Sequence, residues 1–325
     1  MQLIQKIVRK RREYSSWVAN ETMEDYSLRY APRSFRKWSP LLLANTALGG
    51  ISFLALEAIG GSLCLSYGFT NSFRAIIVCS VVIFLTGVPI TYYSARYNLD
   101  MDLLTRGAGF GYIGSTVTSV IYASFTFIFF ALEAAIMAQA LELYFRLPLV
   151  LGYLFCSLCV IPLVAVLRKD HGGAKQLAGA FLASLAVRHG ASIENAAKPI
   201  VMYLTGYEYV FSSRAVVLFV AMMFVVISQM KINVTNAYAG SLAWSNIFSR
   251  LSHRHPGRVV WLIFNVAIAL LLMVFGVFHT LDKVLALYSN VAIAWIGAIV
   301  ADLVINKPLG LSPPYIELKR APRAT

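Results

Sequence analysis

The chain has 325 residues, of which 58% are hydrophobic and 13% are charged, and its formal net charge is +13. A soluble domain of this length would carry about a quarter charged residues, so the composition excludes an ordinary soluble domain. The basic balance does not indicate nucleic-acid binding, because the Lys and Arg residues cluster between long apolar runs, where they set the orientation of a membrane protein.

Seven apolar runs predict membrane-spanning helices, since a helix needs about 20 residues to cross the hydrocarbon core. In chain order the runs are Pro40–Leu65, Ala75–Tyr93, Tyr112–Leu141, Leu147–Leu167, Ala215–Met230, Val259–Phe278 and Val284–Ala301. We therefore expect an all-α polytopic membrane protein with about seven full spanning helices and one short segment.

The basic clusters divide the chain into parts and orient it. We expect a basic cytoplasmic arm in residues 1–39, four membrane helices in 40–167, a junction with a short apolar segment in 168–212, three membrane helices in 213–306 and a cytoplasmic tail in 307–325. Both termini are then predicted on the cytoplasmic side of the plasma membrane, or of the inner membrane in a bacterium. The arm has no short apolar core, so the first spanning helix is expected to direct insertion itself.

The charges require one more crossing than the apolar runs supply. The fourth run returns to a basic, cytoplasmic segment, yet the fifth must start outside for the basic Arg250–Arg258 to lie inside. Between them, Leu177–Val187 is apolar for only 11 residues, about 16 Å of helix or half of the hydrocarbon thickness. The simplest interpretation is that spanning sequence is missing between Leu167 and Ala178, and the alternative is a half-helix or re-entrant segment.

Three charged residues lie within the predicted spanning helices, namely Glu57, Glu133 and Lys231, the last directly after the run Ala215–Met230. Because a charge in a membrane helix is expensive, each is a functional candidate. Glu57 or Glu133 could carry a proton, and the Lys231 ammonium could stand where another transporter binds a metal cation. The alternative is a structural pair of Glu133 with Lys231 that neutralises both.

Polar and glycine residues in the first run indicate a local break in the helix. Asn45 and the pair Gly49-Gly50 suit unwinding, which frees backbone carbonyls to coordinate a cation. Gly60-Gly61, later in the same run, are expected to permit close helix packing.

Two further sets of side chains suit a flat, polar ligand. Phe129 and Glu133 are four residues apart and share one helix face, where a heterocycle could stack on the ring and hydrogen-bond to the carboxylate. Asn233 and Asn236 can project to one side of a later helix, and their amides both donate and accept, as the edge of a nucleobase requires. We find no nucleotide-binding loop, hydrolase triad or metal motif in the sequence, so we expect neither enzyme activity nor a cofactor.

Several motifs together resemble the purine–cytosine permease family of nucleobase–cation symporters. They are Arg29–Arg33, Asn45–Gly50, Arg106–Gly114, Lys231–Asn246, Asn290–Trp295 and Asn306–Pro314. The similarity covers most of residues 26–320, and the segment that starts at Lys231 is its most specific part.

The resemblance implies a five-plus-five inverted-repeat transporter fold, of which this chain would hold a part, and alternating access around a central site. It implies substrate contacts from Phe129, Glu133 and an asparagine, best matched by Asn236 or Asn233. It also implies a cation site, for sodium or a proton, at carbonyls near Ala44–Leu48. The expected partners are a small heterocyclic substrate and the lipid bilayer, without nucleic acid.

Relative to that family, the fifth and sixth helices, the start of the seventh and the last two helices have no counterpart in this sequence. Three functions therefore stay open at this point. The chain is a cation-coupled permease for purine- or pyrimidine-type nucleobases or related heterocycles, a truncated inactive remnant of one, or a membrane scaffold that binds such a ligand without moving it.

Overall fold

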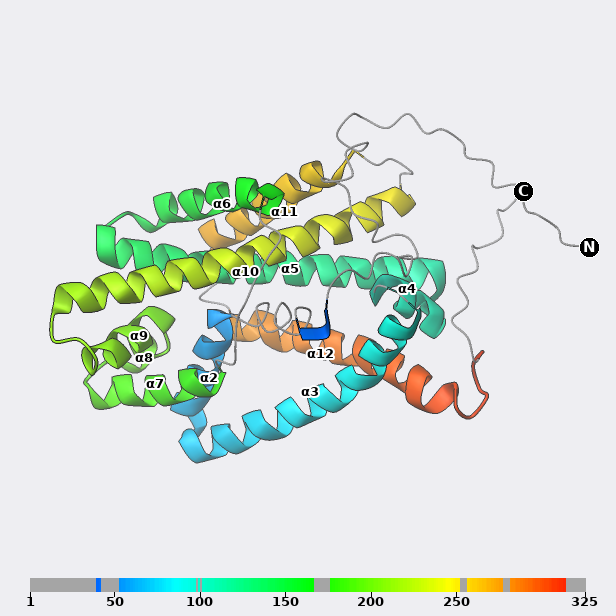
Figure 1. The fold of residues 1–325 in the computed structure, drawn as a ribbon, viewed down its shortest axis with the longest axis horizontal. Helices are drawn as coiled ribbons and strands as arrows, with labels where there is room; N and C mark the ends of the chain where they lie inside the picture. Colours follow the sequence, from blue (N-terminus) through cyan, green and yellow to red (C-terminus); the bar gives the residue numbers. More distant parts are fainter. Residues whose placement is uncertain are drawn as a thin grey trace, which may run out of the picture.

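The computed structural model describes residues 39–41, 53–97, 99, 101–166, 176–251, 256–276 and 281–313. Within these ranges the chain forms helices joined by short connections, and it contains no β-strand (Figure 1). The predicted all-α class is confirmed for the described part of the chain.

Within the described part of the chain, a helix overlaps each apolar run. They are α2 (Leu54–Tyr67), α3 (Phe69–Tyr97), α4 (Met101–Thr105), α5 (Gly111–Phe145), α6 (Leu149–Val166), α7 (Gln176–Arg188), α8 (Ile193–Ala196), α9 (Pro199–Glu208), α10 (Arg214–Leu251), α11 (Arg258–Val274) and α12 (Leu281–Ala301). Short π-helical turns, Arg106–Phe110 and Asp302–Asn306, precede α5 and follow α12.

Among the described residues, four helices are long and apolar enough to cross a membrane: α3, α5, α10 and α12. The apolar parts of α2, α6 and α11 are shorter, at 10–17 residues. The seven predicted runs thus correspond to four helices of spanning length and three shorter ones, and such a set is compatible with an all-α membrane protein.

The core lies between α5, α6, α10 and α11, whose facing residues are mostly small or branched apolar side chains. The helices α5 and α10 lie side by side and antiparallel (Figure 1). Tyr144 near the end of α5 has its ring 6.0 Å from that of Phe219 near the start of α10, and Phe127 lies 6.3 Å from Trp244.

The direction of the helices requires a return between α6 and α10. A three-residue turn, Arg146–Pro148, reverses the chain between α5 and α6, so α6 is antiparallel to α5. Because α10 is also antiparallel to α5, α6 and α10 run in the same direction. The chain between them must return across the bundle, and its described part there is α7, α8 and α9. With 13 residues, α7 is about 20 Å long and shorter than a full span.

Two groups of helices flank this core. α2 packs closely against α7 and α9 at Gly61, where a Cβ would lie 2.5 Å from Met202 Cε and 3.0 Å from Ala183 Cβ, so Gly61 serves close packing as predicted. α12 and α4 bury a second apolar cluster: Leu99, Leu103, Leu104, Trp295, Ile299 and Leu303. On α3 only Ser72 is buried.

Candidate functional site

The buried carboxylate of Glu133 caps the start of α2. Glu133 Oε1 accepts a hydrogen bond of 3.1 Å from the backbone N–H of Ala55, in the first turn of that helix. The first N–H groups of a helix have no partner within it, and the N-cap residue Phe53 supplies no side-chain cap. A carboxylate also suits the positive end of the helix dipole. Glu133 therefore links α5 to the point at which α2 begins.

Phe129 faces the same point from one turn earlier on α5. Its ring lies edge-on to that of Phe53 at 5.4 Å and stacks on Phe125 at 6.1 Å, and Phe125 in turn contacts Tyr288 of α12 at 5.3 Å. Phe129 and Glu133 thus share one face of α5 and meet the residues that open α2.

Glu57 lies in the first turn of α2 and is fully buried. Its Oε1 accepts a hydrogen bond of 2.9 Å from the hydroxyl of Tyr203 on α9. The Tyr203 ring packs 4.5 Å from that of Phe224 on α10. Glu57 therefore ties α2 to the short helices of the junction.

The polar residues of α10 form a buried stripe along α5. Gln229 and Asn233 are fully buried and Asn236 is 7% exposed, and their spacing places them on neighbouring positions of one side of the helix. With its amide nitrogen turned toward Phe130 O and its amide oxygen toward Ala134 N, Asn233 donates to the first at 3.2 Å and accepts from the second at 3.1 Å. This orientation joins the α10 side chain to the α5 backbone.

Other buried amides on α10 and α5 have atoms without a hydrogen-bond partner among the described residues. Neither amide atom of Gln229 has a hydrogen-bond partner among the described residues, and the same holds for Asn236 Nδ2 and for Gln139 Oε1 on α5. Buried polar atoms are nearly always paired in proteins, so unpaired amides between two apolar helices are unusual.

The remaining predicted site residues fall into two groups. Lys231 is partly buried on α10, next to the stripe. Ala44, Asn45, Leu48 and Gly49, predicted for the cation and substrate sites, lie outside the described residues.

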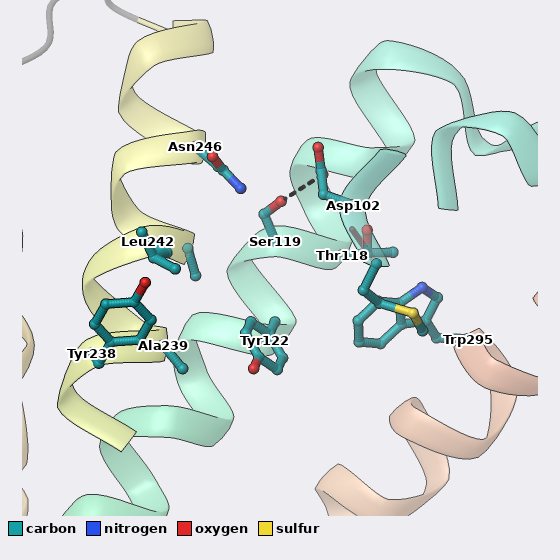
Figure 2. Close-up of a pocket in the computed structure, with 11 residues that line it drawn as sticks. Asp102, Thr118, Ser119, Tyr122, Tyr238, Ala239, Leu242, Asn246 and Trp295 are labelled. Carbon is teal, nitrogen blue, oxygen red and sulfur yellow. Dashed lines mark hydrogen bonds between the residues drawn. The ribbon is translucent and has the colours of Figure 1, made fainter. Parts of the chain in front are cut away.

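A cavity of about 250 Å³ lies between α4, α5, α10 and α12. Figure 2 shows Asn246 reaching from α10 toward Ser119 of α5 and Asp102 of α4. The other lining residues are mainly aromatic or apolar: Met101, Thr118, Tyr122, Tyr238, Ala239, Leu242, Ala243 and Trp295.

The polar edge of the cavity is held by contacts from several elements. Asp102 accepts a hydrogen bond of 3.0 Å from the Ser119 hydroxyl and pairs with Arg106 at 3.6 Å. The chain turns between Asp102 and Ser119 at Gly109 and Gly111, which adopt φ of 91° and 64°. Glycine populates this region without steric cost, so the turn can fold α4 back against α5.

Two of the aromatic residues that line the cavity make further contacts with neighbouring elements. Trp295 Nε1 donates to Thr105 Oγ1 at 3.2 Å. The guanidinium of Arg258, at the start of α11, lies 4.8 Å from the centre of the Tyr238 ring. Both contacts restrict the rings that face the cavity.

None of the predicted site residues that the structure describes lines this cavity. The structure brings Phe129 and Glu133 together at the start of α2, places Asn233 against α5, and lines the cavity with residues that were not predicted as site residues. Six of them lie within the motifs Lys231–Asn246 and Asn290–Trp295: Tyr238, Ala239, Leu242, Ala243, Asn246 and Trp295. Ser119 and Tyr122 share the α5 face of Phe129 and Glu133, which is a periodicity signal. For Asp102 the sequence offers no comparable signal.

Comparison with known proteins finds no matching family model, no similar curated protein and no similar solved structure.

Proposed function

We propose that this protein is a membrane permease for purine- or pyrimidine-type nucleobases or related flat heterocycles, coupled to a cation and working by alternating access. The observation that carries the proposal is the capping of α2 by Glu133, with Phe129 against Phe53 beside it. A helix that begins beside a buried carboxylate and an aromatic ring offers polar groups at membrane depth, as transporter sites do.

The contact also supplies a mechanism for coupling. In the structure Glu133 Oε1 holds the N–H of Ala55. A substrate N–H, or a proton taken up by the carboxylate, would compete with this backbone N–H for the same oxygen. Occupation of the site would then release the start of α2 from α5, and α2 could move against the α5–α10 pair. Such a shift is how one bundle rocks against another in alternating access.

The unpaired amides support a polar ligand in the same region. Gln229 and Asn236 face the α5 side with hydrogen-bonding capacity unused among the described residues. Polar groups inside membrane helices commonly mark substrate or ion pathways. Amides that both donate and accept suit the edge of a heterocycle.

The test is uptake into proteoliposomes that contain the purified chain. Labelled cytosine, adenine, allantoin and hydantoin are offered under a proton or a sodium gradient. We expect saturable uptake of at least one, and a loss of about tenfold or more in Glu133→Gln, which removes the charge at the α2 cap. Glu142→Gln is the matched control, because Glu142 lies on the same helix and is exposed. Flat uptake of all four compounds under both gradients contradicts the proposal.

A second candidate is a membrane protein that binds such a ligand without moving it. It is favoured by the shortness of α7 and α9, which have 13 and 10 residues and return across the bundle where a transporter would use full spans. Ligand-induced thermal stabilisation in detergent, without uptake into liposomes, would select this candidate.

A further inference from the structure

We infer that the cavity between α4, α5, α10 and α12 is a second binding site, for a small, flat, uncharged heterocycle that presents N–H donors to Asp102. The ligand class follows from the lining of the cavity and does not depend on transport. That the substrate occupies this second site during transport is an inference that rests on the proposed function.

The volume limits the size of the ligand. Sites for drug-sized ligands occupy roughly 300–1,000 Å³, and this cavity has about 250 Å³. Its occupant is therefore smaller than a drug-sized molecule, on the scale of one or two fused rings.

The polar edge selects the chemistry of the ligand. Ionised Asp102 can only accept hydrogen bonds, so the facing ligand atoms must donate. Arg106, 3.6 Å away, offsets the carboxylate charge, so a cationic ligand is not required. The Asn246 amide, from the facing helix (Figure 2), can donate and accept. An N–H beside a ring nitrogen or carbonyl, as in a pyrimidine or purine, meets both partners.

The other walls favour a flat molecule. Tyr122, Tyr238 and Trp295 line the cavity, and aromatic rings bind flat ligands by offset stacking or edge contacts. Trp295 is held by Thr105 and Tyr238 by Arg258. Walls that are already fixed lose little conformational freedom when a ligand binds, which favours affinity.

Two of the helices that line the cavity, α5 and α10, also carry residues of the predicted site. On α5, Ser119 and Tyr122 lie on the face that carries Phe129 and Glu133. On α10, Ala239 lies three residues from Asn236, whose amide nitrogen has no partner among the described residues. Asn236 therefore lies within about one helical turn of the cavity wall.

The experiment measures binding by equilibrium dialysis to the purified full chain in detergent, with tritiated uracil and cytosine as probes. All variants also carry Glu133→Gln, which alters the contact of Glu133 with the start of α2. Any further change in binding then reports on the cavity and not on Glu133. We expect the Glu133→Gln protein to bind the probes. Adding Ala239→Leu fills part of the cavity and should weaken binding about tenfold or more, a loss of binding free energy similar to that of one hydrogen bond to a charged group. Ala215→Leu, exposed at the start of α10, is the matched control and should leave binding unchanged.

A second variant tests the role of Asp102 by comparing the binding of ligands with and without N–H donors. An unfolded variant would bind neither ligand, so a changed preference can only come from folded protein. 1,3-Dimethyluracil has the uracil ring without its N–H donors, and we expect it to compete poorly in the parent chain. Asp102→Leu, which has no acceptor oxygen, should remove most of that preference. Absence of probe binding in the Glu133→Gln background, unchanged binding in Ala239→Leu, or an intact preference in Asp102→Leu overturns the inference. If the chain binds the probes in this way but shows no uptake, the permease proposal is contradicted and the second binding site is kept.

Discussion

Glu133 combines a structural contact with a predicted functional role, and substitutions at the residue scale separate the two. Its carboxylate caps α2 at Ala55 N from within a fully buried position. Glu133→Ala removes the cap and should lower the free energy of unfolding by about 1–3 kcal/mol. Glu133→Gln keeps an acceptor oxygen and should lose less. Thermal unfolding in detergent, followed by tryptophan fluorescence, checks both, and Glu142→Ala is the exposed control. Equal midpoints for Glu133→Ala and Glu142→Ala would refute the capping role.

Asn233 and Asn236 are the two candidates for the predicted substrate contact on this helix, yet their surroundings differ. Asn233 bonds to the α5 backbone at Phe130 and Ala134, whereas Asn236 Nδ2 has no partner among the described residues. Asn233→Leu should cost about 0.6–1.7 kcal/mol of stability, the range for hydrogen bonds between membrane helices. Asn236→Leu gives up no bond from Nδ2 to a described residue, so it should cost less stability than Asn233→Leu, and it should abolish uptake. The same unfolding and uptake assays measure the pair. If Asn236→Leu unfolds as early as Asn233→Leu, Asn236 is structural.

At the scale of elements, Gly240 fixes how closely α10, α5 and α11 approach. A Cβ on Gly240 would lie 2.5 Å from Thr126 Oγ1 and would also meet Asn265 Oδ1. That oxygen accepts from Trp244 Nε1 at 3.1 Å and from Thr126 Oγ1 at 3.3 Å, so an added methyl group would disturb a buried three-helix network.

Gly240→Ala should therefore destabilise the bundle by about 1–3 kcal/mol, the usual cost of overpacking. Gly297→Ala on α12 is the matched control, because nothing lies within 4 Å of its Cβ position, and alanine favours a helix over glycine by up to about 1 kcal/mol. Chemical unfolding of both variants gives the comparison. A Gly240→Ala variant as stable as the parent would show that α10 can move away from α11 at no cost.

The junction helices offer a third test at this scale. Tyr203 of α9 donates to buried Glu57, so Tyr203→Phe leaves the carboxylate with one hydrogen bond fewer and should cost about 1–3 kcal/mol. Tyr207 lies one turn further along α9 and packs against Phe224 as well, which makes Tyr207→Phe the matched control. Thermal unfolding should show a lower midpoint for Tyr203→Phe alone. Identical midpoints would mean that α9 is held to α2 by packing only.

Hydropathy predicts these helices because each one corresponds to a single continuous stretch of apolar sequence. The run Ala215–Met230 continues through Lys231 and both asparagines as one helix, α10, since packing against α5 outweighs their polarity. The pairing of Phe129 with Glu133 on one face followed from helical periodicity. The cavity could not be predicted in this way, because Asp102 and Trp295 are far apart in sequence and meet only through the packing of α4 and α12 against α5.

For the whole molecule, the directions of the helices make a prediction about topology. The turn after α5 and the start of α10 lie at one end of the bundle, since Tyr144 contacts Phe219, and Arg96 at the end of α3 is predicted on the cytoplasmic side. We replace the four native cysteines and introduce Leu147→Cys, Ser213→Cys or Arg96→Cys, all at exposed positions. A membrane-impermeant maleimide should label Leu147→Cys and Ser213→Cys in intact cells, and Arg96→Cys only after permeabilisation. This result requires α7 to α9 to return the chain across the bilayer. Labelling of Leu147→Cys and Ser213→Cys from opposite sides would mean that α7 and α9 stay on one side, so that α10 enters the membrane in the other direction.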